Sequence, residues 1–174
     1  MIRSWLRRGI WVLLLASACA PAIGSAQASA AGVHPRLAIR TLDGKTFDLA
    51  AERGKWVIVN FWATWCSPCI AEMPAISKYV ATHGNVTAIG LAYDRTPRAD
   101  IVKFAQKHPV DYQLAQLDMD HLPAGLAMPE GLPTTYLIAP DGHEAHRFVG
   151  PVDAKSLDAA IAGTGPRASA HASR

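Results

Sequence analysis

Two cysteines three positions apart, Cys66 and Cys69, carry the clearest chemistry in this chain. They follow an apolar run of strand length and stand where a helix is expected to begin, so both thiols lie on one face of its first turn and can close a disulfide. At the helix N-cap, Cys66 would meet unpaired backbone N–H groups, which favour a thiolate. We therefore predict a redox-active dithiol in which Cys66 is the nucleophile and Cys69, one turn further on, resolves the mixed disulfide.

The same spacing occurs in zinc sites, whose four ligands usually include a second cysteine pair or a histidine pair. The third cysteine, Cys19, lies in the N-terminal segment, and no two histidines stand at ligand spacing near the motif. His143 and His146 fall on an expected strand, where residues three apart point to opposite faces of the sheet. We therefore predict neither a metal site nor a cofactor.

The elements that must position the dithiol can be predicted from hydrophobic periodicity and turn signals. Residues 56–61 form a continuous apolar run, as expected of a buried central strand that delivers the dithiol to its C-terminal end. The helix after Cys66 carries an apolar stripe at i, i+3, i+4 spacing, which predicts packing against the sheet. Elsewhere we expect a hairpin at 37–49, strands at 85–93, 112–117, 134–138 and 144–149, and helices at 98–107 and 154–162.

The residues around the cysteines resemble a thioredoxin-fold active site and, within that superfamily, are most similar to the TlpA/ResA-like extracytoplasmic thiol-disulfide oxidoreductases. Two stretches carry the resemblance: FWATWCSPC at 61–69, followed by AEMP at 71–74, and LPTTYLI at 132–138. The similar region covers residues 35–162. It implies an α/β thioredoxin fold, in which a central mixed sheet is flanked by helices, with an N-terminal hairpin and an inserted helix and strand between 94 and 117.

The resemblance also implies how a partner protein would dock. The second signature of the family contains a cis proline that faces the dithiol, and Pro133 matches it; an ordinary trans proline at the start of a strand is the alternative. The backbone before a cis proline would pair with an incoming peptide like an added strand. We therefore expect a docking groove whose substrate-binding residues are Trp62, Trp65, Leu132, Pro133 and Thr134.

The attack by Cys69 requires a proton acceptor, for which a buried carboxylate is the usual solution. In simple thioredoxins this acid lies on the strand before the motif, where the present chain has Asn60. The resemblance points instead to the end of the next core strand, so Asp94 is the candidate acid–base residue; a turn or helix-capping role is the alternative. For Glu72 we expect a solvated side chain on the helix surface.

The N-terminal segment has the features of a secretion signal, with basic residues at 3–8, an apolar core at 10–16 and small residues up to Ala28. The apolar core is shorter than the roughly 20 residues that a spanning helix needs. Cys19 raises the alternative of a lipoprotein, but a lipobox has leucine where this chain has Ala16. We expect cleavage after Ala28, and membrane attachment only if the segment is retained or Cys19 is lipidated.

A chain of 174 residues suits one domain of ordinary size. We predict a signal peptide at 1–28, a linker at 29–34, a thioredoxin-like domain at 35–162 and a disordered tail at 163–174. Three of the 17 Lys and Arg residues lie in the first segment, so its removal leaves 14 basic and 14 acidic residues. A neutral domain argues against a nucleic-acid-binding surface.

These features, taken with the resemblance, predict a periplasmic or otherwise extracytoplasmic enzyme that reduces disulfides of exported proteins, such as apocytochrome c. A membrane electron donor of the DsbD/CcdA type is implied, because a reductant in an oxidising compartment must be re-reduced. Net oxidation or isomerisation is the alternative within enzymes, since Ser67 and Pro68 do not set the reduction potential. Copper handling by the two thiols is the alternative from another class; a peroxidase would need a motif that this chain lacks.

Overall fold

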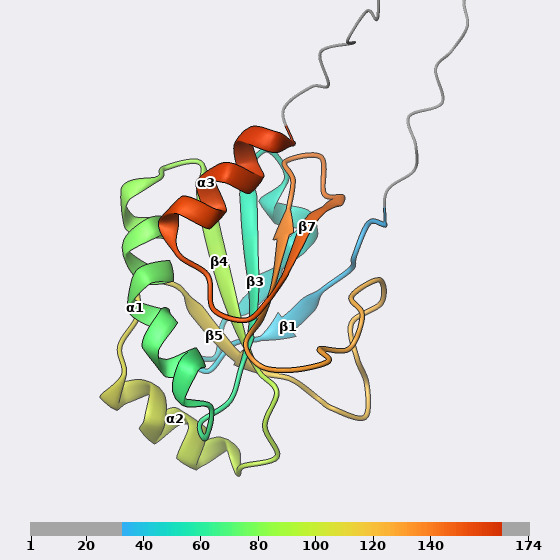
Figure 1. Cartoon of the computed structure of the whole chain (residues 1–174). Helices are drawn as coiled ribbons and strands as arrows, with labels where there is room; N and C mark the ends of the chain where they lie inside the picture. The colour runs from blue at the N-terminus through green and yellow to red at the C-terminus, as the bar shows by residue number, and fades with distance from the viewer. Residues whose placement is uncertain (1–32, 165–174) are drawn as a thin grey trace, which may run out of the picture. The chain divides into compact units, whose positions relative to one another are not determined.

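The structure is a computed structural model that describes residues 33–164 (Figure 1). The predicted signal peptide lies outside these residues, as do most of the predicted linker and most of the predicted tail. The described residues form two small β-strands, a five-stranded sheet, three α-helices and one 3₁₀ turn. In chain order they are β1 (Ala38–Arg40), β2 (Thr46–Asp48), the 3₁₀ turn (Leu49–Glu52), β3 (Trp56–Trp62), α1 (Ser67–Thr82), β4 (Val86–Ala92), α2 (Arg98–Lys107), β5 (Gln113–Gln116), β6 (Thr134–Ile138), β7 (Glu144–Val149) and α3 (Ala154–Gly163).

The main sheet has the strand order β5-β4-β3-β6-β7 and is mixed. β3 pairs in parallel with β4, and β4 pairs in parallel with β5, whereas β6 runs antiparallel to β3 and β7 antiparallel to β6. The helices α1 and α2 make the crossovers that parallel strands require. This arrangement confirms the predicted thioredoxin fold, including the N-terminal hairpin and the inserted helix and strand.

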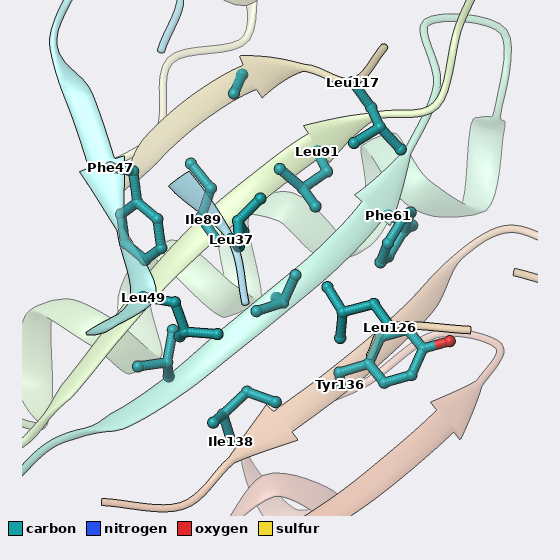
Figure 2. Close-up of a cluster of buried hydrophobic side chains, with 13 residues drawn as sticks. Leu37, Phe47, Leu49, Phe61, Ile89, Leu91, Leu117, Leu126, Tyr136 and Ile138 are labelled. Carbon is teal, nitrogen blue, oxygen red and sulfur yellow. The ribbon is translucent and has the colours of Figure 1, made fainter. Parts of the chain in front are cut away.

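The central position of β3 explains its composition, because a strand flanked on both sides and covered on both faces reads as a continuous apolar run. Its alternate residues point to opposite faces of the sheet. Val57, Val59 and Phe61 enter the cluster shown in Figure 2, which the hairpin covers with Leu37, Phe47 and Leu49. Ile58 and Trp62 enter two clusters on the other face, which is covered by the helices.

The segment between β5 and β6 crosses the hairpin side of the sheet and is held there by a few specific contacts. Leu117 and Leu126 are buried in the same cluster as Phe61. The Tyr136 hydroxyl donates a hydrogen bond to the Ala127 carbonyl at 2.7 Å, and the Arg36 N–H donates to the Ala124 carbonyl at 2.8 Å. This segment leads directly into the Leu132–Pro133 bond, so its attachment positions one wall of the site.

Within residues 33–164, none of the helices is both long enough and apolar enough to cross a bilayer.

Gly125 offers a test of how firmly this segment must be held. Its φ of +83° lies in the left-handed region, and a β-carbon there would lie 2.9 Å from the Cα of Pro35. We expect Gly125→Ala to lower the free energy of unfolding by about 1–2 kcal/mol in urea titrations, because strain and a backbone clash add. Gly84→Ala is the matched control: nothing lies within 4 Å of its β-carbon, so its effect should stay within about 0.5 kcal/mol. Equal losses in the two variants would contradict this interpretation.

Candidate active site

The dithiol lies at the junction between β3 and α1, as the sequence predicts. Cys66 is the N-cap residue of α1, with extended φ and ψ angles of −90° and 94°, and its sulfur accepts a hydrogen bond from the Cys69 N–H at 3.3 Å. Pro68 lies in the first turn, where backbone N–H groups have no partner within the helix, so its missing N–H costs no helical hydrogen bond. Cys66 and Cys69 form a disulfide with their Cα atoms 5.3 Å apart.

The two sulfur-bearing residues differ in their access to solvent. Cys66 is 4% exposed and Cys69 is fully buried. Cys66 is therefore the member of the pair that a partner's disulfide can reach, and Cys69 can attack only within the protein. This asymmetry matches the predicted roles of nucleophile and resolving thiol.

A groove of about 590 Å³ borders the dithiol loop. Trp65, which is 68% exposed, forms one of its walls, and Leu132 lines it while also packing against the buried cluster that contains both cysteines. The remaining lining comes from residues 93–96, Met119 and 129–131. Trp65 and Leu132 therefore line one groove beside the dithiol loop, and their contact with a docked partner stays a prediction.

Three other predicted groove residues are buried. The Leu132–Pro133 bond is cis, as the family signature implies, and the Pro133 carbonyl accepts a hydrogen bond from the Gly150 N–H at 2.9 Å. Thr134 is 1% exposed and donates to the Gly131 carbonyl at 2.7 Å. Trp62 is fully buried and stacks on Phe104, with ring centroids 5.6 Å apart. This corrects the expectation that Trp62 contacts a docked partner. The side chains of Ile58 and Trp62 point to the face of β3 that the helices cover, and there Trp62 packs in the same buried cluster as both cysteines.

Asp94 is buried at the end of β4, and its carboxylate binds the loop that carries the dithiol. It accepts hydrogen bonds from the Thr64 N–H at 2.9 Å and the Thr64 hydroxyl at 2.6 Å, and from the Thr96 N–H at 2.9 Å. Burial by itself would raise the pKa of Asp94, but these hydrogen bonds outweigh it and lower the pKa. A carboxylate held in its ionised form is a weak proton acceptor, so the geometry favours a positioning role. Pro97, not Asp94, is the N-cap residue of α2.

Glu72 requires a correction, because it is 4% exposed and not solvated as expected. Its Oε1 accepts a hydrogen bond from the Asn60 amide at 2.7 Å, and its Oε2 accepts one from the Val152 N–H at 2.8 Å. The Asn60 amide also donates to the Thr135 hydroxyl at 2.9 Å. The Glu72 carboxylate thus links α1 to β3 through Asn60 and to the segment before α3 through Val152.

The protonation of Glu72 is strongly affected by this environment. Burial raises its pKa, and the hydrogen bonds from Val152 and Asn60 offset only part of that effect. A carboxylate with a raised pKa is a stronger proton acceptor than an ordinary one, and a general base for a thiol needs that property. Glu72 follows Cys69 by three positions on α1, so both face the same side of the helix.

Comparisons with known proteins agree with this geometry. Residues 32–146 match the model of the AhpC/TSA family. The thiol-disulfide oxidoreductase ResA of Bacillus cereus is 30% identical over 126 residues, covering 71% of this chain and 72% of ResA. The chain belongs to the AhpC/TSA family and, among its members, is a ResA-like thiol-disulfide oxidoreductase.

Solved structures of ResA-like fold support the same assignment. A Chlorobium tepidum protein assigned as the thiol:disulfide interchange protein DsbE has a TM-score of 0.66 and 25% identity, covering 76% of this chain and 95% of its own. A secreted Mycobacterium tuberculosis disulfide oxidoreductase homologous to Escherichia coli DsbE has a TM-score of 0.59 and 27% identity, with coverages of 73% and 95%. Among residues 33–164 of the ResA-like chain, no cluster of three or more His, Cys, Asp or Glu side chains is placed to hold a metal ion.

The sequence prediction of a solvated Glu72 in this ResA-like site was wrong, although one signal of burial was present. The residue lies three positions after Cys69, and the apolar stripe of α1 continues through Met73 and Ile76. A charged residue beside that stripe could be solvated or buried, and periodicity does not distinguish the two. The burial is decided by Val152, whose N–H comes from the distant segment before α3.

The raised pKa of Glu72 makes a prediction for stability. Between its ordinary value of 4.5 and the raised pKa, the folded protein keeps a proton that the unfolded chain has lost. The free energy of unfolding of the wild type should therefore fall as the pH rises through this window. In Glu72→Gln this fall should disappear, which urea titrations from pH 4 to pH 8 will measure. Parallel pH dependences in the two proteins would contradict the raised pKa.

The lowered pKa of Asp94 predicts the opposite dependence. Its hydrogen bonds stabilise the protein above the ordinary value of 3.8, and this contribution is lost as the pH falls through the lowered pKa. Asp94→Asn should cost about 1–3 kcal/mol at pH 7 and progressively less in acid, while leaving the pH profile of disulfide reduction unchanged. Asp100→Asn, which removes an exposed partner of Lys103, is the control and should cost under about 1 kcal/mol. A shifted activity profile in Asp94→Asn would restore Asp94 as an acid–base residue.

Proposed function

We propose that this protein is an exported enzyme that reduces disulfides of extracytoplasmic proteins. The observation that carries the proposal is the arrangement of the pair: an N-cap cysteine beside an exposed tryptophan and a groove, and a buried cysteine on the same helix face as a buried carboxylate. Cys66, with Trp65 and the groove, can contact a protein substrate. Cys69, with Glu72, can complete the thiol-disulfide exchange in a part of the site that excludes solvent. The signal-like segment at 1–28 and the secreted Mycobacterium tuberculosis relative support export.

The chemistry proceeds in two exchanges. The Cys66 thiolate attacks one sulfur of the substrate disulfide; a Cys66–substrate disulfide forms and the other substrate sulfur leaves as a thiolate. Cys69 then gives its proton to Glu72 and attacks the Cys66 sulfur, which releases the second substrate sulfur. Two electrons pass to the substrate, and the enzyme is left as the Cys66–Cys69 disulfide. A thiol-bearing membrane donor of the DsbD/CcdA type would reduce it again.

The remaining site residues take supporting roles in this proposal. Trp65 and the Leu132 backbone would contact the substrate chain, with Pro133 facing the dithiol. Trp62, Thr134 and Asp94 would hold the loop and the strand end in place from inside. An apocytochrome c, which presents a cysteine pair before haem attachment, is the substrate class that the resemblance favours.

The reduction step can be trapped with cysteine variants. With a disulfide-bearing protein such as insulin, Cys69→Ser should accumulate a mixed disulfide on Cys66, because the resolving thiol is gone, and turnover should fall by at least about a hundredfold. Cys66→Ser should form no mixed disulfide. In the uncleaved chain, Cys19→Ser is the matched control and should behave as the wild type. Non-reducing gels and mass spectrometry measure the adduct; an adduct on Cys69 in place of Cys66 would reverse the assigned roles.

The direction of electron flow needs a separate measurement. Equilibration of Cys66–Cys69 with glutathione buffers should give a potential at or below roughly −200 mV, whereas a value near about −120 mV is that of a strong oxidant and would overturn the reductase assignment. In a Gram-negative host, alkylation of the full-length protein should find the pair reduced in the periplasmic fraction only when a membrane thiol donor is present. A cytoplasmic location would contradict export.

A further inference from the structure

Three buried polar atoms near Glu72 have no hydrogen-bonding partner among the described residues. They are Oδ1 of Asn60, Nε1 of Trp62 and the hydroxyl oxygen of Tyr112. An unpaired buried polar group costs about 1–3 kcal/mol, so three of them in one region require an explanation.

Gly90 marks a point that the Trp62 and Tyr112 side chains both approach and that lies beside Asn60 in the sheet. It is the register partner of Asn60 on the adjacent strand, and a β-carbon at Gly90 would lie 3.1 Å from Trp62 Nε1 and 3.2 Å from a Tyr112 ring carbon. Asn60 and Trp62 are two positions apart on β3, so their side chains share this face of the sheet. The nearest atom to that β-carbon would be Leu114 Cδ2 at 2.5 Å, so the Leu114 side chain packs over Gly90 and bounds the region on that side.

Glu72 borders the same region. The amide of Asn60 donates to its Oε1, so the unpaired oxygen of Asn60 belongs to a side chain already bound to the carboxylate. Burial raises the pKa of Tyr112, and the charge of Glu72 raises it further, which places the Tyr112 hydroxyl within electrostatic range of Glu72 without a direct hydrogen bond. Polar groups so placed are commonly joined by a water molecule.

The donors and acceptors match one water. The Trp62 N–H can only donate, the Asn60 oxygen can only accept, and the Tyr112 hydroxyl can do either. A water would accept from Trp62 and Tyr112 and donate to Asn60 and to the Glu72 carboxylate, which completes its tetrahedral set. Buried waters typically make about three such bonds.

We propose that Asn60, Trp62 and Tyr112 hold an internal water against Glu72, and that the Tyr112 hydroxyl positions this water to stabilise the carboxylate when Cys69 has given up its proton. This inference rests on the proposed function, in which Glu72 receives that proton. When Glu72 is protonated it can donate to the water, and rotation of the Tyr112 hydroxyl lets the same water remain bound. Tyr112 is thus a positioning residue that acts through Glu72.

The other titratable groups near Glu72 have partners of their own or take part in the reaction. Cys69 lies one turn earlier on α1 and supplies the proton. Asp111 accepts a hydrogen bond from the Ser77 hydroxyl further along α1. Asp153 caps α3, where its carboxylate accepts from the Ser156 N–H. None of these bonds involves Tyr112, so removal of the Tyr112 hydroxyl changes only its bond to the proposed water.

The test compares Tyr112→Phe with Tyr136→Phe by carbon NMR titration of the Glu72 carboxyl in the reduced and oxidised protein; Glu72→Gln assigns the signal. Tyr112→Phe should raise the pKa of Glu72 by about half a pH unit or more, because a hydrogen bond that supports the carboxylate is lost. It should move the pH profile of disulfide reduction in the same direction. Tyr136→Phe removes a hydroxyl on the opposite face of the sheet, where it holds the groove wall through Ala127. It should leave the pKa of Glu72 unchanged, and any loss of turnover should come without a shift of the pH profile. No shift in Tyr112→Phe, or equal shifts in the two variants, would overturn the inference.

A crystal structure at about 1.5 Å resolution provides a second measurement. A water within hydrogen-bonding distance of Asn60 Oδ1, Trp62 Nε1 and the Tyr112 hydroxyl is expected, and a dry region or a direct Tyr112–Glu72 bond would overturn the site. The proposed function fails separately: if Glu72→Gln reduces substrate with an unchanged pH profile, Glu72 is not the proton acceptor, whatever the outcome for Tyr112.

Discussion

The structure depends on one residue having two roles at the same time: Cys66 caps helix α1 and is also the reacting group. As a cap, its sulfur accepts the Cys69 N–H, which orients the first turn. As a nucleophile, it gains from the same N–H groups, since they stabilise negative charge on sulfur. The hydrogen bond that caps the helix therefore also favours the thiolate form of Cys66. The rest of the structure must place this end of the helix within reach of a partner.

The sheet places the helix end there and divides the site into an outer side, which carries the groove, and an inner side, which holds Glu72 and Asn60. β3 is buried on both faces and ends at the dithiol loop, which Asp94 ties to the end of β4 through Thr64. On the outer side, Trp65 and Leu132 line the groove. On the inner side, Glu72 and Asn60 form a polar contact within an otherwise apolar layer. In the proposed reaction, the exchange with a partner takes place on the outer side and the proton transfer to Glu72 on the inner side.

On the inner side, burial of the Glu72 carboxylate lowers the stability of the fold and at the same time raises the pKa of that carboxylate. A buried carboxylate that accepts only two hydrogen bonds destabilises the fold when it is charged. The same burial raises its pKa, which makes it a stronger proton acceptor. Asp94, which is equally buried, receives three hydrogen bonds and stays ionised. The pKa values of the two carboxylates shift in opposite directions, because burial outweighs the hydrogen bonds at Glu72 whereas the hydrogen bonds outweigh burial at Asp94.

The sequence by itself determined the order of the elements and the two cysteines, because strand runs, helical stripes and the motif at the strand end are local patterns. The fold class followed from the resemblance of two sequence stretches to the TlpA/ResA-like proteins. The sequence also determined that Pro133 matches a cis proline signature, which the structure has as a cis bond. Tertiary structure alone decided which side chains are buried: Glu72, by an N–H 80 positions away, and Trp62, by the covering helices. Burial depends on what packs over a side chain, and that neighbour comes from distant parts of the chain.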